Sequence, residues 1–278
     1  MSDRAGVVLR RLLASDIPAA VQLSEQAGWN QTAEDWRMLT DLAPEGCLAI
    51  EVDGELAATT TLISYGRSLA WIGMVLTKLS FRGRGFARCL LTQALKQADE
   101  MRIETVKLDA TDQGRPLYEK IGFRFEQAVE RWARPGTRHA STSALPLGEP
   151  PVEDWSVADH RAFGADRSDL LQRLVQRTQL PLFIGSSYLL TRPGRQARYL
   201  GPSVCDEPAT GRALMERVLQ IAGPQDCSWD LLPRNSNAAA FAQDFAFTPT
   251  RYLHRMVRGK DLPAKEEMIY AIAGFELG

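Results

Sequence analysis

The sequence predicts an α/β fold, with helices on the faces of a mixed β-sheet, built twice within a chain of 278 residues. Three observations support this prediction. Strand-like and helix-like segments alternate through the first half. A stretch rich in Pro, Gly, Ser and Thr interrupts the chain at 134–154, and the second half repeats the pattern of the first 124 residues later. We therefore expect two domains, at 1–135 and 154–278, joined by a linker at 136–153.

The first half begins with a strand and two helices. A strand is expected at 7–11, and residues 15–28 carry a Ser-Asp cap, an early Pro and a closing Gly, which are helix start and stop signals. Thr32 and Asp35 resemble a capping box, which predicts a second helix at 33–42. Two helices therefore separate the first strand from the rest of its sheet.

A hairpin and three later strands complete the expected sheet of the first half. Strands at 47–52 and 55–63 flank an Asp-Gly turn, which is a strong hairpin signal. The other expected elements are strands at 69–77, 105–111 and 122–132 and helices at 87–98 and 115–121.

The second half resembles a divergent repeat of the first. The helical segment "ARCLLTQAL" at 87–95 aligns with "GRALMERVL" at 211–219, and the same offset places Arg131 on Arg255. A closing strand is expected at 248–259. We expect the second half to keep the fold and to pack its sheet against that of the first half.

Composition restricts the possible functions. The chain is 45% hydrophobic and 24% charged, as in ordinary globular proteins, and its formal net charge of -1 argues against a nucleic-acid-binding protein. The four cysteines lie far apart, which indicates buried, reduced thiols and no metal site. No signal-peptide core and no run of transmembrane length occurs, so we expect a cytoplasmic protein with no membrane partner.

One basic, glycine-rich turn predicts an anion site. The stretch "SFRGRGFARCLL" at 80–91 places two arginines and two glycines immediately before an apolar helical pattern. A helix N-terminus offers unpaired N–H groups and a positive dipole end, and glycines let a phosphate approach them closely. The alternative is a basic surface turn that only caps the helix.

The same turn carries a family resemblance. The pattern R-G-R-G-F-A at 82–87, followed by "LDATDQGRPLYEKIGF" at 108–123, resembles two motifs of the GNAT superfamily of acyl-CoA-dependent N-acyltransferases. The resemblance covers roughly residues 7–132, and the whole chain resembles GNAT proteins with a second, divergent GNAT-like domain. It implies that the anion is the pyrophosphate of coenzyme A, with acetyl-CoA as the acyl donor.

The resemblance also implies how coenzyme A is held. Backbone N–H groups of the turn would bind the pyrophosphate, and the strand before it would pair with the amide-rich pantetheine arm. A backbone N–H near Leu76 could polarise the thioester carbonyl. The implied cofactor-binding residues are Val75, Leu76, Thr77, Arg82, Gly83, Arg84, Gly85, Phe86 and Ala87.

The resemblance implies a general acid, but the general base stays open. The family position of Tyr118 implies a general acid that protonates the departing thiolate, although a tyrosine packed on the sheet would give the same pattern. The strand before the turn contains no acid, so the general base stays unassigned among Asp109, Asp112, Glu25 and Asp35.

The acceptor is expected to be a small amine. Trp29, Asn30 and Trp36 lie between and within the first two helices, where aromatic walls with a few polar groups would suit a small amphipathic amine. The tryptophans could equally well only attach the two helices to the sheet. In the second half, the positions of the first arginine and second glycine of the turn hold Asp206 and Ala209, and the tyrosine position holds Ala242, so we expect no coenzyme A there. The second half is then expected to be a structural domain or a wall of the acceptor site.

These features predict an N-acetyltransferase that transfers acetyl from acetyl-CoA to a primary amine of a small molecule by direct attack, with no metal. Two alternatives stay open. One is a non-catalytic acyl-CoA-binding sensor or interaction module, and the other is a protein N-acetyltransferase with an open groove. The sequence leaves the oligomeric state undetermined.

Overall fold

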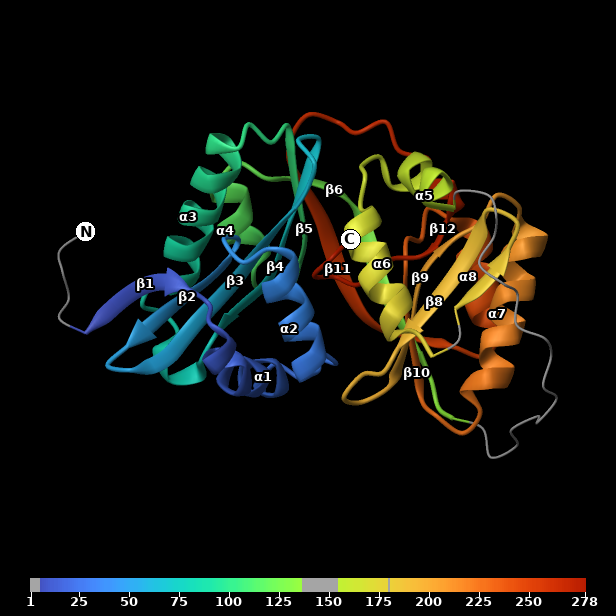
Figure 1. Ribbon diagram of the computed structural model, residues 1–278, viewed down its shortest axis with the longest axis horizontal. Helices are drawn as coiled ribbons and strands as arrows, with labels where there is room; N and C mark the ends of the chain where they lie inside the picture. The colour runs from blue at the N-terminus through green and yellow to red at the C-terminus, as the bar shows by residue number, and fades with distance from the viewer. Residues whose placement is uncertain (1–5, 137–154, 180) are drawn as a thin grey trace.

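A computed structural model describes residues 6–136, 155–179 and 181–278 (Figure 1). Two short 3-10 helices, Ala14–Asp16 and Leu79–Phe81, occur in the first half, and a third, Glu266–Met268, in the second. The first half contains β1 (Val7–Arg11), α1 (Ile17–Gln26), α2 (Ala33–Leu42), β2 (Cys47–Val52), β3 (Glu55–Tyr65), β4 (Leu69–Thr77), α3 (Phe86–Glu100), β5 (Thr105–Ala110), α4 (Arg115–Lys120) and β6 (Arg124–Arg134).

The second half repeats much of this order. It contains α5 (Trp155–Phe163), α6 (Ser168–Arg177), β7 (Leu182–Ile184), β8 (Ser187–Arg192), β9 (Arg198–Val204), α7 (Pro208–Ala222), β10 (Cys227–Leu231), α8 (Ser236–Asp244), β11 (Thr248–Gly259) and β12 (Ile269–Ala271). The mixed α/β class and every element expected in the first half are confirmed. The expected linker lies largely outside the described residues, and the division into two domains stays a proposal.

Local signals explain the first elements. Thr32 accepts a hydrogen bond from the Asp35 N–H at 3.3 Å, and the Asp35 carboxylate accepts one from the Thr32 N–H at 2.7 Å, which confirms the capping box of α2. Asp53 and Gly54, between β2 and β3, have φ values of 50° and 82°. This is the backbone that a tight hairpin turn requires.

The described strands form one continuous 12-stranded sheet, so the expectation of two sheets packed against each other is wrong (Figure 1). The order is β1-β2-β3-β4-β5-β11-β6-β10-β9-β8-β7, and β12 pairs with β9. The halves exchange their last strands: β11 lies between β5 and β6, antiparallel to both, and β6 reaches across to pair with β10. Backbone hydrogen bonds join the halves, which packed faces would not provide.

Two buried ion pairs accompany this exchange. Arg131 of β6 binds the Asp230 carboxylate with two hydrogen bonds of 2.6 Å, and Arg255 of β11 binds the Asp109 carboxylate at 2.9 and 3.0 Å. Arg131 and Arg255 are the residues that the internal repeat aligns. Their equivalent pairing across the exchanged strands supports the repeat, and each pair connects one half to the other.

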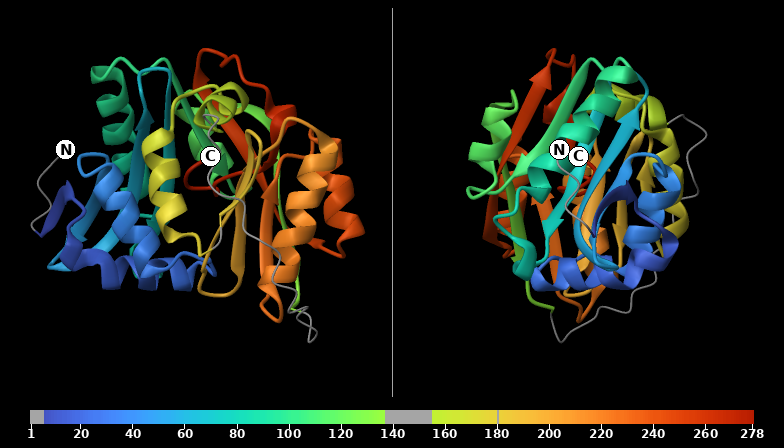
Figure 2. Two further views of the ribbon diagram at one scale, coloured as in Figure 1. Left: turned by 45° about the vertical axis from the view of Figure 1, so that its right-hand side comes forward. Right: turned by 90° about the vertical axis from the view of Figure 1, so that its left-hand side faces the viewer.

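Helices cover both faces of the sheet (Figure 2). α3 and α4 pack on one face of the first half through a core that includes Leu90 and Leu91. On the other face, α1 and α2 share a single core with α5 and α6, in which Trp36 and Phe163 are both buried. α7 and α8 cover the second half with a separate core. The shared core places α1 and α2 of the first half beside α5 and α6 of the second.

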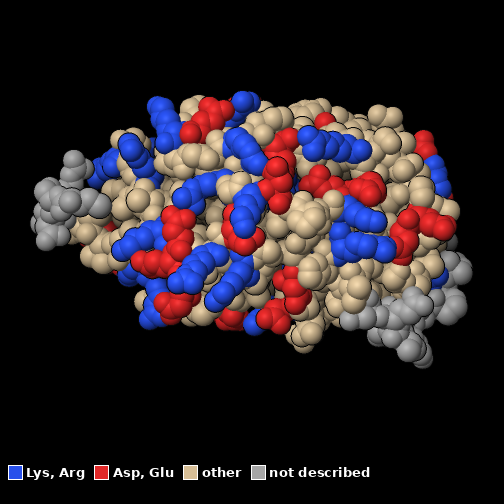
Figure 3. Space-filling view, turned by 90° about the horizontal axis from the view of Figure 1, so that it is seen from above, with Lys and Arg blue, Asp and Glu red and all other residues tan. Residues whose placement is uncertain are grey.

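Basic and acidic side chains are interspersed on the face seen in Figure 3. No helix in the described residues is long and apolar enough to cross a membrane. Within the same residues, no group of three or more His, Cys, Asp and Glu side chains is arranged to hold a metal ion.

Candidate functional site

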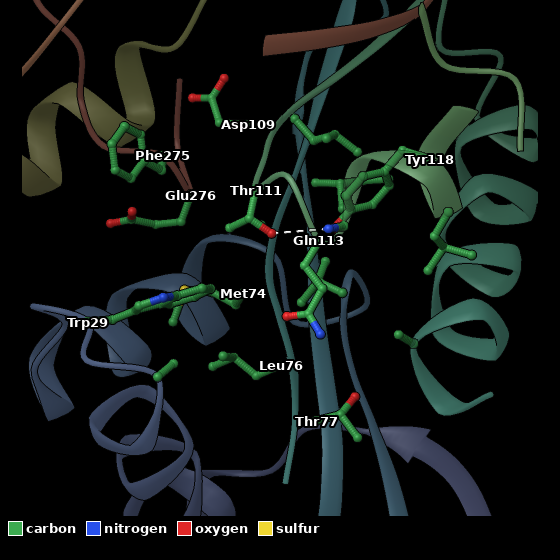
Figure 4. Close-up of a pocket in the computed structure, with 18 of the residues that line it drawn as sticks. Trp29, Met74, Leu76, Thr77, Asp109, Thr111, Gln113, Tyr118, Phe275 and Glu276 are labelled. Carbon is green, nitrogen blue, oxygen red and sulfur yellow. Dashed lines mark hydrogen bonds between the residues drawn. The ribbon is translucent and has the colours of Figure 1, made fainter. Parts of the chain in front are cut away.

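A cavity of about 780 Å³ opens where β4 and β5 separate (Figure 4). The two parallel strands pair from Leu69↔Thr105 only as far as Trp71↔Lys107, although β4 continues to Thr77 and β5 to Ala110. Beyond Trp71, the edge of β4 that faces β5 therefore has no strand partner in that ladder. Backbone N–H and C=O groups along this edge can pair with an extended ligand.

A β-bulge in β4 marks the centre of this edge. In the ladder between β3 and β4, Thr59 pairs with Leu76 and Thr61 pairs with Gly73. Two residues of β4 therefore lie opposite a single residue of β3. Met74, in the bulge, has a φ of 49°, and its carbonyl accepts a hydrogen bond of 2.8 Å from the Thr59 hydroxyl. A bulge of this kind redirects backbone groups out of the ladder and is common beside active sites.

The basic turn forms a second wall of the cavity. Gly83 and Gly85 have φ values of 77° and 82°, and Gly85 caps the N-terminus of α3. A Cβ on either glycine would meet no protein atom within 4 Å, so the space beside them is open. The backbone therefore takes a conformation that only glycine adopts without strain, around space large enough for an anion.

Three exposed arginines lie around this helix start. Arg82 donates to the Thr77 carbonyl at 3.3 Å, the Arg84 guanidinium lies 5.1 Å from the Phe81 ring centroid, and Arg88 lies in the first turn of α3. None of the three forms an ion pair within the residues that the structure describes. A cation in the first turn opposes the helix dipole, so a bound anion would stabilise this arrangement.

Tyr118 lines the side of the cavity formed by β5 and α4 (Figure 4). The residue is 7% exposed, and its ring packs against Gly114, where a Cβ would lie 3.0 Å from the ring. Phe123 contacts the same ring edge-on at a centroid distance of 6.1 Å. Burial raises the pKa of the Tyr118 phenol well above its ordinary value. The hydroxyl is therefore held in the protonated form that can donate to a leaving group.

Two acidic residues from different parts of the chain line the cavity. Asp109 of β5 is fully buried, and both its oxygens are bound by Arg255. Glu276 follows β12, and its backbone lies against Gly73, where a Cβ would meet the Glu276 carbonyl oxygen at 2.7 Å. Burial raises the pKa of each carboxyl, although an arginine beside each acts against this.

The other acids considered as bases do not enter the cavity. Asp35 caps α2 and pairs with Arg177 at 2.9 Å. Asp112 is 93% exposed and binds His254, and Glu25 is exposed on α1. Glu276 was not predicted because its approach to β4 depends on the whole fold. The nearest sequence signal is Gly73, whose lack of a side chain admits the backbone of residue 276.

Of the three expected acceptor residues, the structure brings only Trp29 to the cavity. Trp36 has no exposed surface and donates its indole N–H to the Ser24 hydroxyl at 3.0 Å, so it belongs to the helix core. Asn30 accepts from the N–H groups of Gln196 and Ala197 and joins the loop after α1 to the second half. Trp36 is therefore packed in the helix core, and the Asn30 side chain is bound to backbone groups of the second half.

The residues expected to hold coenzyme A are brought together, with one exception. All of them except Arg84 line the cavity. The sequence predicted the second half as a wall of this site but identified none of its residues, which are Arg251 and Leu253 from β11 and Phe275 and Glu276 from the segment after β12. Figure 4 shows Trp29, Phe275 and Glu276 on one side of the cavity and Tyr118 on the other.

The corresponding cleft of the second half is filled by the chain itself. β9 pairs with β10 only as far as Leu200↔Trp229, just as β4 separates from β5. Beyond that point, β12 pairs with β9 at Ser203 and Val204. Asp206, where the first half has Arg82, forms an ion pair with Arg161. The edge that is open in β4 is therefore occupied in β9.

Comparisons with known proteins agree with this geometry. A sequence profile described as "Acetyltransferase (GNAT) family" matches residues 15–123, and one described as "Acetyltransferase (GNAT) domain" matches residues 156–271. The chain is 31% identical over 173 residues to the "Uncharacterized N-acetyltransferase YitH" of Bacillus subtilis (strain 168). That match covers 60% of this chain and 60% of the relative.

Solved structures share the fold over nearly the whole chain. A presumed acetyltransferase from Pyrococcus horikoshii has a TM-score of 0.86 at 22% identity, covering 98% of this chain and 96% of that one. A GCN5-related N-acetyltransferase from Sphaerobacter thermophilus has a TM-score of 0.69 at 17% identity, covering 95% and 99%. The arrangement of two joined halves therefore recurs in other proteins.

Proposed function

We propose that this chain, which belongs to the GNAT family of acetyltransferases, transfers an acetyl group from acetyl-CoA to a primary amine of a small molecule. One observation carries the proposal: the open edge of β4, the glycine turn at α3 and Tyr118 all face a single cavity. Acetyl-CoA supplies the thioester carbonyl that an amine can attack directly. The residues of this chain bind the donor, orient the amine and move two protons.

The donor's place follows from the charges and the open backbone. The N–H groups of residues 83–87 and the nearby arginines suit a pyrophosphate, and the β4 edge at Val75, Leu76 and Thr77 suits the amides of the pantetheine arm. An N–H at the bulge would donate to the thioester oxygen as negative charge develops on it.

Glu276 is the proposed general base. An alkylamine with a pKa near ~10.4 must lose a proton before or during attack. Glu276 lies against β4 beside the bulge, and each of its oxygens has one described partner: Arg192 at 3.1 Å and Gln31 at 2.9 Å. A carboxylate oxygen can accept more than one hydrogen bond, directly or through water. The fully buried Asp109, bound at both oxygens by Arg255, is better suited to hold β11 in place.

Tyr118 is the proposed general acid, and Tyr118→Phe should lower kcat by about 100-fold or more because the thiolate then leaves unprotonated. Acetyl-CoA affinity should stay unchanged. Because the acid works in its protonated form and burial raises its pKa, wild-type activity should show no loss from Tyr118 ionisation up to pH ~10. Steady-state rates across pH, with calorimetric binding, check this. Undiminished turnover of the variant at every pH would rule out the acid role.

The number of donor sites tests the proposed function most directly. We expect calorimetric titration with acetyl-CoA to give one site per chain, because β12 occupies the second cleft. Chains with bound donor should then release free thiol when small amines are added. Two sites would mean that β12 leaves β9 under these conditions, and no binding would contradict the proposed function itself.

Two alternatives differ from this proposal in specific ways. A non-catalytic sensor would bind acetyl-CoA and release no thiol with any amine. The absence of an acid in β4 favoured that alternative, but the backbone of Glu276 lies against Gly73 of β4 and Glu276 lines the same cavity. A protein N-acetyltransferase would need an open groove, whereas β11 and the segment after β12 form part of the wall here.

A further inference from the structure

On the acceptor side of the cavity, the arginine side chains outnumber by one the carboxylates that pair with them. Arg131 and Arg251 are direct partners across the β6–β11 ladder, and both line the cavity. Arg131 is satisfied by Asp230, whose carboxylate it binds with two hydrogen bonds. In the parts of the chain that the structure describes, the Arg251 side chain makes no hydrogen bond and no ion pair. Like charges placed directly opposite each other on a sheet are destabilising, so this pair has an energetic cost.

The remaining charges at this end are already matched. Glu276 is bound by Arg192, and Asp109 by Arg255. Burial, together with the charge of Arg131, lowers the pKa of Arg251, which means that the empty site disfavours its positive charge. One anionic charge from outside the chain would remove that excess. A monoanion such as a carboxylate balances it, whereas a phosphate dianion would leave a negative excess.

Two aromatic rings hold Arg251 in position while leaving its donors available. Its guanidinium carbon lies 5.7 Å from the centroid of the Trp29 ring and 5.8 Å from that of Phe275. Ring contacts of this kind use the face of the guanidinium and leave its in-plane N–H groups free for a carboxylate, which they can bind through two parallel hydrogen bonds. The same rings form apolar walls for the carbon body of a ligand.

We infer that the acceptor is an amine that also carries a carboxylate, an amino acid in chemical class, and that Arg251 binds the carboxylate while Trp29 and Phe275 flank the apolar part. This inference rests on the proposed function and names the substrate class of the same site. Arg251 thereby acts as a specificity-determining residue, because amines without the carboxylate leave its charge unmatched. The amine end is directed toward Glu276, the residue that follows Phe275.

The test compares amines that differ only by the carboxylate. Suitable pairs are L-phenylalanine with 2-phenylethylamine, L-leucine with 3-methylbutylamine, and 4-aminobutyrate with propylamine, assayed by thiol release from acetyl-CoA. The wild type should favour the acids of at least one pair by about 10-fold or more in kcat/KM. Arg251→Gln should raise KM for those acids by about 10- to 100-fold and leave KM for acetyl-CoA and for the plain amines unchanged.

Matched variants separate recognition from folding. Arg258→Gln makes the same change on the same strand, at a residue paired with Asp99 on the surface, and should leave the preference intact. Arg251→Lys keeps the charge and should keep part of the preference. Calorimetric titration of the preferred acid into wild-type and variant protein saturated with coenzyme A gives the affinity change without turnover.

Two outcomes would overturn the inference alone: equal use of acids and plain amines by the wild type, and an equal loss of both in Arg251→Gln. Absence of acetyl-CoA binding, or binding with no thiol release from either set of amines, would instead contradict the proposed function on which the inference rests. The two failures are therefore distinguishable.

Discussion

Gly85→Val should abolish measurable acetyl-CoA binding, with a loss of affinity of about 100-fold or more, because at least two charge-assisted hydrogen bonds to the pyrophosphate would be lost. Gly85 has a φ of 82° at the N-terminus of α3. A β-branched residue in that region is strained by about 1–3 kcal/mol and would relax by turning the peptide groups of the turn. Its side chain would also project into the open space that the anion needs.

A matched variant in the second half separates this effect from general destabilisation. Ala209 is the equivalent position at the start of α7 and is exposed, so Ala209→Val should leave both acetyl-CoA affinity and thermal midpoint nearly unchanged. Calorimetry on both variants, with thermal unfolding as a check of folding, provides the comparison. Unchanged affinity in Gly85→Val would remove the turn from the donor site, and a large loss in Ala209→Val would contradict the inactive second cleft.

Glu276→Gln should lower kcat/KM by about 100- to 10,000-fold, the range for removal of a general base. The amide keeps the shape of the side chain but cannot accept the proton of the attacking amine. Burial raises the pKa of the Glu276 carboxyl. The acid limb of the wild-type profile should therefore lie above the ordinary range of a glutamic acid, with activity rising as Glu276 ionises, and this limb should vanish in the variant.

Glu276 also pairs with Arg192, so a structural role must be separated from a chemical one. Weakly basic acceptors, which are largely unprotonated at neutral pH, need a base less than alkylamines do. The loss in Glu276→Gln should therefore shrink as the pKa of the acceptor amine falls, while acetyl-CoA affinity stays constant. A loss of equal size for every acceptor would indicate that Glu276 only positions its neighbours.

The donor side of the cavity could be predicted from the sequence because its signals are local. The φ values at Gly83 and Gly85, the start of α3 and the position of Tyr118 depend on residues close to one another in the chain. Such local requirements are visible in the sequence. A left-handed backbone requires glycine, and a packed helix shows apolar residues at helical spacing. The mixed sheet followed from the same kind of signal.

The acceptor side was decided by the tertiary structure. The indole N–H of Trp71 donates to the Phe275 carbonyl across 204 positions of the chain, and Arg251 meets Arg131 only because β11 inserts beside β6. Periodicity shows that a strand exists but does not show which edge it joins, since any strand with the right alternation satisfies the pattern. The sequence by itself therefore determined the family, the class of fold and the glycine turn that we propose binds the donor. Only the tertiary structure decided the joined sheet, the closure of the second cleft and the charges at the acceptor end, because these arise from backbone pairing and ion pairs between residues far apart in the chain.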